Sequence, residues 1–182
     1  MPHAGVALID PRVIFDKVGL ARGMRVADLG CGRTGHFVFP AAKVVGDTGV
    51  VYAVDIMKDV LENIRNRVRS EGYDNVQTVW SDVESVGKTS IPINSLDGCF
   101  IVNVFFMVKN KAAVIREAAR ILKSGGFLSI VEWAKKLGPL GPAEGSMVPP
   151  ETLIAAAKEN QLALVENFPA GDYHYCLIFK KV

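Results

Sequence analysis

A short apolar run that passes straight into a glycine-rich turn is the feature that most constrains this chain. Residues 26–29, Val-Ala-Asp-Leu, have the composition of a buried strand, and Gly30, Gly32 and Gly35 follow with the spacing G-x-G-x-x-G. A helical stretch continues to about Val45. Glycines at such a junction permit a tight turn and let a ligand approach backbone N–H groups closely. The segment predicts a strand, a ligand-binding turn and a helix.

Further strands alternate with helices along the next hundred residues. Apolar runs predict strands at residues 50–54, 76–80, 96–104 and 127–131. Helical periodicity is found at residues 11–22, 60–68 and 111–122. We expect Ser124-Gly125-Gly126 to cap the last of these helices. Strands that alternate with helices in this way favour a parallel sheet with helices on both faces.

The pattern changes after the fifth strand. A loop rich in Gly and Pro, residues 138–150, leads into a helix at about residues 151–159. Residues 162–168 and 173–180 then flank the short turn 169–172, which lets the two strands pair antiparallel. The expected fold is therefore α/β, with a Rossmann-like, seven-stranded, mostly parallel sheet and an antiparallel C-terminal hairpin.

Composition narrows the class of protein. The chain has 182 residues, 49% of them hydrophobic, and a net charge of +2, which fits one domain over residues 1–182 and gives no attraction to nucleic acid. Cys31, Cys99 and Cys176 lie too far apart to suggest a disulfide framework or a zinc site. No stretch resembles a signal peptide or a membrane span. We expect a cytoplasmic protein without a metal or membrane insertion, and a homodimer is compatible with the sequence.

Acidic residues at successive strand ends indicate which ligand the turn binds. Asp55 lies twenty residues after Gly35, where a carboxylate can accept hydrogen bonds from both hydroxyls of a ribose. NAD and S-adenosylmethionine both contain that ribose. Asp28 favours the second, because a carboxylate there would repel a pyrophosphate but attract an ammonium and a sulfonium.

The third acid, Asp82, ends the third strand and is placed to accept a hydrogen bond from an adenine amino group. Ile56 and Val83 could enclose the ring. Each aspartate alone is more commonly a helix cap or a solvated strand end. Three at neighbouring strand ends predict an adenosine site.

Together these motifs resemble those of class I S-adenosylmethionine-dependent methyltransferases, especially the small ubiquinone/menaquinone-biosynthesis-like group, called methyltransferase type 11. Residues 28–35, including Cys31, resemble the family's first motif, Asp55 its ribose-binding acid, and Ser81-Asp82-Val83 its adenine-contacting segment. Residues 122–126 resemble its motif before strand five. The resemblance covers nearly the whole chain, implies S-adenosylmethionine as cofactor, and implies a seventh strand inserted antiparallel between strands five and six.

Groups near the transferred methyl should follow the fourth strand, since ligands of open α/β sheets bind at the carboxyl ends of the strands. Asn103 could orient a substrate oxygen or the cofactor's amino group, or only bond a loop. Phe105 and Phe106 could each face the core or the pocket, and Asn103 and Phe106 are the catalytic candidates. His36 and His174 give little indication of acid–base catalysis.

The main hypothesis is methyl transfer to an O, N, S or C atom of a small molecule. The alternatives are a nicotinamide-dependent oxidoreductase and a non-catalytic S-adenosylmethionine-binding module. The sequence leaves room for a modest lid only, drawn from residues 8–15 and 133–150 over a pocket lined by Phe106 or Trp133. Such a pocket favours a planar or apolar acceptor over protein or duplex nucleic acid.

Overall fold

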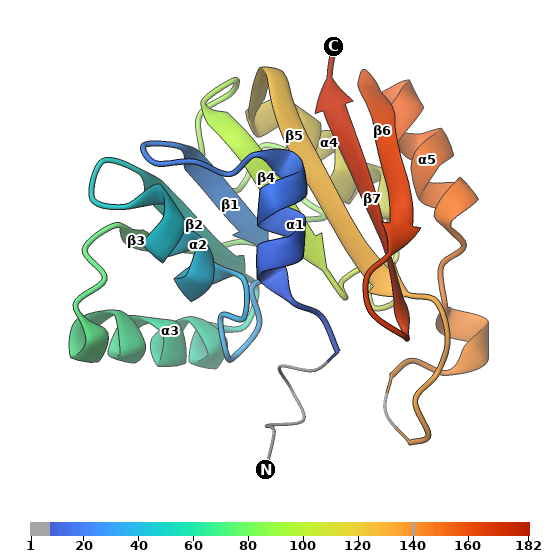
Figure 1. Ribbon diagram of the computed structural model, residues 1–182, viewed down its shortest axis with the longest axis horizontal. Helices are drawn as coiled ribbons and strands as arrows, with labels where there is room; N and C mark the ends of the chain where they lie inside the picture. The colour runs from blue at the N-terminus through green and yellow to red at the C-terminus, as the bar shows by residue number, and fades with distance from the viewer. Residues whose placement is uncertain (1–7, 140) are drawn as a thin grey trace.

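The computed structural model describes residues 8–139 and 141–182, and within them seven strands form one sheet (Figure 1). The strands are β1 (Arg25–Leu29), β2 (Val50–Asp55), β3 (Val76–Trp80), β4 (Leu96–Val102), β5 (Leu122–Trp133), β6 (Leu162–Pro169) and β7 (His174–Lys181). Their spatial order is β3-β2-β1-β4-β5-β7-β6. The first five run parallel, whereas β7 is antiparallel to both neighbours. The predicted sheet is confirmed, including the last strand inserted between the fifth and sixth.

Helices cover both faces of the sheet. They are α1 (Pro11–Val18), α2 (Val38–Val45), α3 (Lys58–Glu71), α4 (Lys111–Ile121) and α5 (Pro150–Glu159), with a 3₁₀ turn η1 (Glu144–Ser146). α1, α2 and α3 lie on one face, and α4 and α5 on the other (Figure 1). Along β4, Cys99 and Ile101 therefore pack toward α4 and α5, whereas Phe100 packs beside Phe15 and Phe37. None of the helices in the described residues is both long and apolar enough to cross a bilayer.

Two helix boundaries near the amino terminus differ from those expected. α1 ends at Val18, well before residue 22, because Gly19 has a left-handed φ of 66° and its N–H donates to the Asp16 carbonyl. α2 begins only at Val38, so residues 36 and 37 still form a turn between Gly35, the last glycine of the motif, and the helix. The connection between β1 and α2 is therefore longer than the G-x-G-x-x-G motif itself.

The expected cap after α4 is wrong. The helix ends at Ile121, and Leu122 is already extended, so residues 124–126 belong to β5. The extra residues are absorbed by an irregularity in strand pairing, since Leu122 lies opposite Leu96 whereas Phe127 lies opposite Gly98. The Phe127 ring occupies the space where any side chain at position 98 would lie, with a Cβ there only 2.0 Å from the ring.

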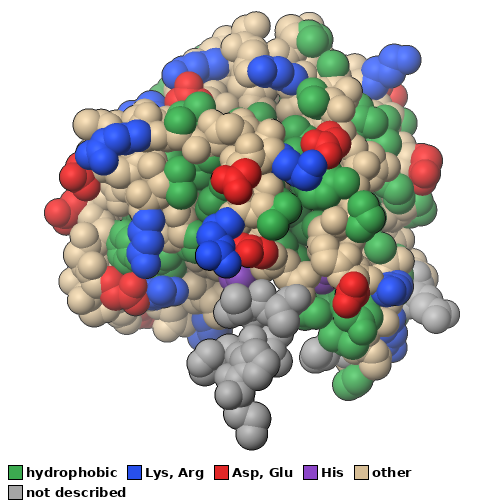
Figure 2. Space-filling model, viewed as in Figure 1, with side chains coloured by type: hydrophobic (Ala, Val, Ile, Leu, Met, Phe, Trp, Pro, Cys, Tyr) green, Lys and Arg blue, Asp and Glu red, His purple; other side chains and the backbone are tan. Residues whose placement is uncertain are grey.

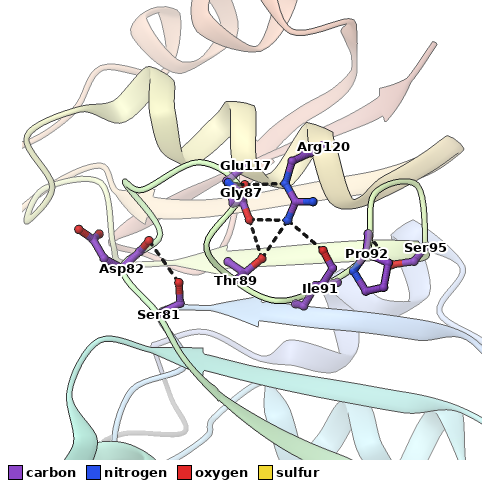
Figure 3. A network of polar contacts seen from close by, with 9 residues as sticks. All are labelled: Ser81, Asp82, Gly87, Thr89, Ile91, Pro92, Ser95, Glu117 and Arg120. Atoms are coloured by element: carbon purple, nitrogen blue, oxygen red, sulfur yellow. Dashed lines mark hydrogen bonds and ion pairs between the residues drawn. The ribbon is translucent and has the colours of Figure 1, made fainter.

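A buried carboxylate fixes the connection between β3 and β4. Glu117 of α4 is fully buried and accepts hydrogen bonds from the Gly87 N–H at 2.6 Å, the Thr89 hydroxyl at 2.5 Å and the Arg120 guanidinium at 2.8 and 2.9 Å (Figure 3). Arg120 also donates to the Ile91 carbonyl at 2.9 Å. Burial alone would raise the pKa of Glu117, but these hydrogen bonds together hold it below its ordinary value. The network holds the segment that follows β3 against α4.

We expect Glu117→Gln to lower the free energy of unfolding at pH 7 by about 1.5–3 kcal/mol, because the variant loses charged hydrogen bonds to a buried group. Urea unfolding followed by circular dichroism measures the change, and Glu62→Gln, at an exposed glutamate of α3, is the control. The difference in free energy of unfolding between wild type and the variant should shrink as the pH falls below 4.5, the ordinary pKa of glutamate. Protonation of Glu117 then removes the same charge from wild type. A change no larger than the control's would contradict the assigned role.

Candidate active site

A cavity of about 730 Å³ lies at the carboxyl ends of the parallel strands. Its wall contains residues that end or follow β1, β2, β3 and β4, and also His174, the first residue of β7. Because β7 runs antiparallel to β5, it begins at the edge where the parallel strands end, with His174 opposite Trp133. The volume is in the range of sites for small organic molecules. The sheet therefore brings residues from five strands to one pocket.

The glycine turn is shaped by the close approach of the segment after β4. Gly30 has a φ of 83°, and a Cβ there would lie 2.5 Å from Cγ2 of Val104. The N–H groups of Gly30 and Cys31 both donate to the Val54 carbonyl, at 2.8 and 3.0 Å. Gly30 therefore has to be glycine both for its backbone conformation and for space.

The third glycine has a different place. Gly35, with a φ of 57°, packs away from the cavity, and a Cβ there would meet Phe39 at 2.7 Å and Ile64 at 2.9 Å. Its role in this structure is close packing of the turn on α2 and α3. Gly32 lines the cavity, and its N–H donates to Oδ2 of Asp55 at 3.1 Å.

Asp55 and Asp82 lie at the ends of neighbouring strands on the cavity wall. Asp55 accepts hydrogen bonds on both oxygens, from Gly32 and from the Met57 N–H at 2.9 Å. Asp82 accepts from the Glu84 N–H at 2.9 Å. Each carboxylate oxygen can accept a second hydrogen bond, so both side chains keep capacity for hydroxyl or amino groups of a ligand.

Asp28 is the most deeply buried acid of the site. The residue is 3% exposed, and its Oδ1 has no hydrogen-bond partner among the described residues. Burial, and then the neighbouring charge of Asp55, raise the pKa of Asp28 to about 7. A cationic ligand group beside Asp28 would stabilise its ionised form and give Oδ1 a donor.

Asn103 directly follows β4 and has an unusual backbone conformation. Its φ is 56°, in the left-handed region that non-glycine residues seldom adopt. Its N–H donates to the Val131 carbonyl at 2.9 Å, which holds the residue at the end of the strand. Its side-chain Oδ1 is buried and, within residues 8–139 and 141–182, has no partner. Backbone strain of this kind concentrates at functional sites.

Among the described residues, the buried side-chain polar atoms without a hydrogen-bond partner all belong to residues of this cavity wall. In the described part of the chain they are Oδ1 of Asp28, Oδ1 of Asn103 and both ring nitrogens of His174. All three residues line the cavity. Buried polar groups are nearly always hydrogen-bonded in folded proteins, so three residues with such atoms around one cavity indicate that a ligand completes them. The same described residues hold no cluster of three or more side chains suited to a metal ion.

Most of the sequence-predicted residues come together here. The cavity wall contains these predicted cofactor residues: Asp28, Gly30, Cys31, Gly32, Asp55, Ile56, Ser81, Asp82, Val83 and Asn103. Gly35 and the catalytic candidate Phe106 are not part of it. Phe105 is fully buried in the core, and its N–H donates to the buried carboxylate of Glu132 at 2.8 Å. Phe106 is half-buried outside the cavity, and cofactor binding by the residues on the wall stays a prediction.

Other parts of the wall lie outside the predicted cofactor residues. Met107 and Val108 follow β4 and line the cavity, and Leu8 and Ile9 close another side of it. Nε2 of His36 lies 2.9 Å from the Ile9 carbonyl and anchors this segment. The amino-terminal part of the expected lid thus reaches the cavity, whereas the described residues of the loop, 133–139 and 141–150, are not part of its wall. Met107 and Val108 follow an apolar strand, and in sequence such apolar residues cannot be told from residues of the hydrophobic core. They therefore give no sequence signal of a pocket.

Comparison with known proteins gives consistent matches. A family described as "Methyltransferase domain" matches residues 20–167. The aklanonic acid methyltransferase DauC of Streptomyces sp. (strain C5) is 31% identical over 170 residues, which cover 90% of this chain and 76% of that protein. The ubiquinone/menaquinone biosynthesis C-methyltransferase UbiE of Hahella chejuensis is 31% identical over 137 residues, 75% of this chain and 53% of that protein. This chain thus matches about half the length of that relative.

Among solved structures, a SAM-dependent methyltransferase from Aquifex aeolicus superposes with a TM-score of 0.88 at 24% identity. The superposition covers 100% of this chain and 94% of the Aquifex chain. At this identity the likeness is one of fold.

We expect Asp28→Asn to change how stability depends on pH. Between the ordinary aspartate value of 3.8 and about 7, the unfolded wild-type chain has released a proton that the folded chain still holds. Wild type should therefore lose stability relative to the variant by up to about 1.4 kcal/mol per pH unit across this interval. Urea unfolding of both proteins from pH 4 to 8 measures the slope, with Asp74→Asn, at an exposed aspartate, as control. If wild type and Asp28→Asn differed in free energy of unfolding by the same amount at every pH, the raised pKa of the buried Asp28 carboxyl would be contradicted.

Proposed function

Because the chain belongs to the family described as "Methyltransferase domain", we propose that it is a class I S-adenosylmethionine-dependent methyltransferase that transfers the cofactor's sulfonium methyl group to a small-molecule acceptor. The observation that carries the proposal is the set of unpartnered buried atoms on Asp28, Asn103 and His174, which surround one cavity. The cofactor carries an ammonium, a sulfonium, two ribose hydroxyls and an adenine. These groups match the acids and the amide on the wall.

The proposed cofactor site follows the strand order. Asp55 of β2 would accept the ribose hydroxyls, and Asp82 after β3 the adenine amino group, with Val83 beside the ring. Asp28 of β1 would face the cationic part of the cofactor, which accounts for a carboxyl buried without a partner. Ile56, the proposed cover for the other side of the adenine, is 57% exposed and would lose water contact on binding.

When bound, S-adenosylmethionine supplies a methyl group that is already activated for transfer. The protein's part is to hold an acceptor in line with that group and to exclude water from it. Leu8, Ile9, Met107 and Val108 give the cavity wall apolar parts that suit this task. Val104 lies against Gly30, so the acceptor side and the cofactor turn are in direct contact.

A small, partly apolar and planar acceptor fits this wall best. The relatives from Hahella and Streptomyces are named for ubiquinone/menaquinone biosynthesis and for aklanonic acid, which supports a small organic acceptor for this chain as well. On the face shown in Figure 2, basic and acidic side chains are interspersed, which offers no tract for a nucleic-acid backbone. The acceptor atom is left open between C, O, N and S.

The cysteines bear on the setting of the reaction. Cys31, Cys99 and Cys176 are free and buried. Free thiols of this kind support a reducing, cytoplasmic setting. Family membership favours methyl transfer over the nicotinamide-dependent alternative, and turnover separates it from a non-catalytic binding module.

The test is to incubate the protein with methyl-labelled S-adenosylmethionine and, separately, a metabolite extract, a proteome and nucleic acid. We expect label in organic-extractable small molecules. The matched variants are Asp55→Ala, which should transfer less label at limiting cofactor because it lacks the proposed ribose partner, and Asp74→Ala at the exposed aspartate, which should not. Label confined to protein or nucleic acid would contradict a small acceptor, and no label in any fraction would contradict methyl transfer.

A further inference from the structure

His174 is a buried histidine that the proposed cofactor site does not use. It is 2% exposed, lines the cavity, and packs against the Trp133 ring with centroids 4.2 Å apart. Its backbone is fixed, because its carbonyl accepts from the Ala170 N–H at 2.9 Å. Neither ring nitrogen has a hydrogen-bond partner in the described residues. If His174 served only to pack against Trp133, an apolar ring would do so better, because it would not bury two nitrogens that lack hydrogen bonds.

The position of His174 in the sheet separates it from the adenosine acids. Asp82, Asp55 and Asp28 belong to the end formed by β3, β2 and β1, whereas β7 lies beyond β4 and β5 on the other side. A ligand whose adenosine occupies the β1–β3 part leaves the part toward β7 for a second molecule. Asn103, at the end of β4, lies between the two parts in strand order.

The imidazole is neutral over the physiological pH range. Burial lowers the pKa of His174 to about 4. The titratable side chains that share the cavity are Cys31, Arg33, His36, Asp28, Asp55, Asp82 and Glu84. On the adjacent strand, the Glu132 carboxylate accepts from the N–H groups of Phe105 and Trp133. A neutral imidazole has one N–H donor and one nitrogen that can accept a proton.

We propose that His174 is the acceptor-side catalytic residue: it binds a hydroxyl of a planar acceptor and takes its proton during methyl transfer. This inference rests on the proposed function and adds to it the class of acceptor, a phenol or enol. A hydroxyl fits because it can donate to the bare nitrogen, while an adjacent oxygen can accept from the ring N–H. Both unpartnered nitrogens would then be satisfied.

The proposed step balances in atoms and charge. The O–H bond breaks, and its proton goes to the bare nitrogen of His174. The electron pair freed on the oxygen, or on a carbon conjugated with it, forms the bond to the methyl carbon as the C–S bond breaks and its pair goes to sulfur. The products are the methylated acceptor, S-adenosylhomocysteine and an imidazolium, which later returns its proton to water. One positive charge moves from the sulfonium to the imidazolium, so the buried cavity gains no net charge.

The test compares wild type, His174→Gln and the neighbouring control Tyr173→Phe, which is outside the cavity wall. At saturating labelled S-adenosylmethionine, the rate of label transfer into the organic-extractable fraction of a metabolite extract is measured from pH 6 to 8.5. Calorimetry with S-adenosylhomocysteine checks that the proposed cofactor site of the cavity is intact in each variant. We expect His174→Gln to bind this compound like wild type and to transfer label about 100-fold more slowly at pH 7.

The pH profile distinguishes a proton acceptor from a packing residue. Without a base the acceptor must ionise by itself, so the rate of His174→Gln should rise by up to about tenfold per pH unit, whereas wild type and Tyr173→Phe stay nearly level. Equal rates, or a slow variant with a wild-type profile, would overturn the inference. His174→Phe keeps a ring against Trp133 and makes the same test if His174→Gln does not fold. Wild type that labels no small molecule would defeat the proposed function, and this inference with it.

Discussion

The close approach of the Gly30 backbone to Val104 is the contact on which the rest of the site depends. A single added carbon at position 30 would lie 2.5 Å from the Val104 side chain, so the turn after β1 and the segment after β4 fit together only around a glycine. The same turn is held to β2 through the Val54 carbonyl and the Asp55 carboxylate. Three strand ends are thereby drawn together, and the residues that end them face one cavity.

The cavity wall has buried polar atoms for which the described residues provide no hydrogen-bond partner. Asp28 is buried as a carboxyl with a raised pKa, and His174 as an imidazole with a lowered one, so burial favours the neutral form of both. A cationic cofactor favours ionisation of the first, and an acceptor hydroxyl gives the second a partner. Buried polar groups without partners lower the stability of the protein at these positions, and a bound ligand would supply the missing partners.

The parts predicted from sequence were those fixed by local pattern. The strands and the acids at their ends follow from apolar runs and from the rule that parallel strands end at one edge, which is why Asp28, Asp55 and Asp82 converge. His174 depends on register instead: only the antiparallel pairing of β7 with β5 brings a strand start to that edge. The Glu117 network and the left-handed end of α1 at Gly19 likewise depend on contacts or backbone angles that composition does not reveal.

The most direct test of the central claim is a crystal structure of the protein with S-adenosylhomocysteine. The account predicts ribose hydroxyls within hydrogen-bond distance of Asp55, the ammonium within reach of Asp28, and the sulfur turned toward Asn103, with the space beside His174 still open for an acceptor. Adenosine bound elsewhere, or the amino-acid part of the ligand placed against His174 with Asp28 left unpartnered, would contradict it.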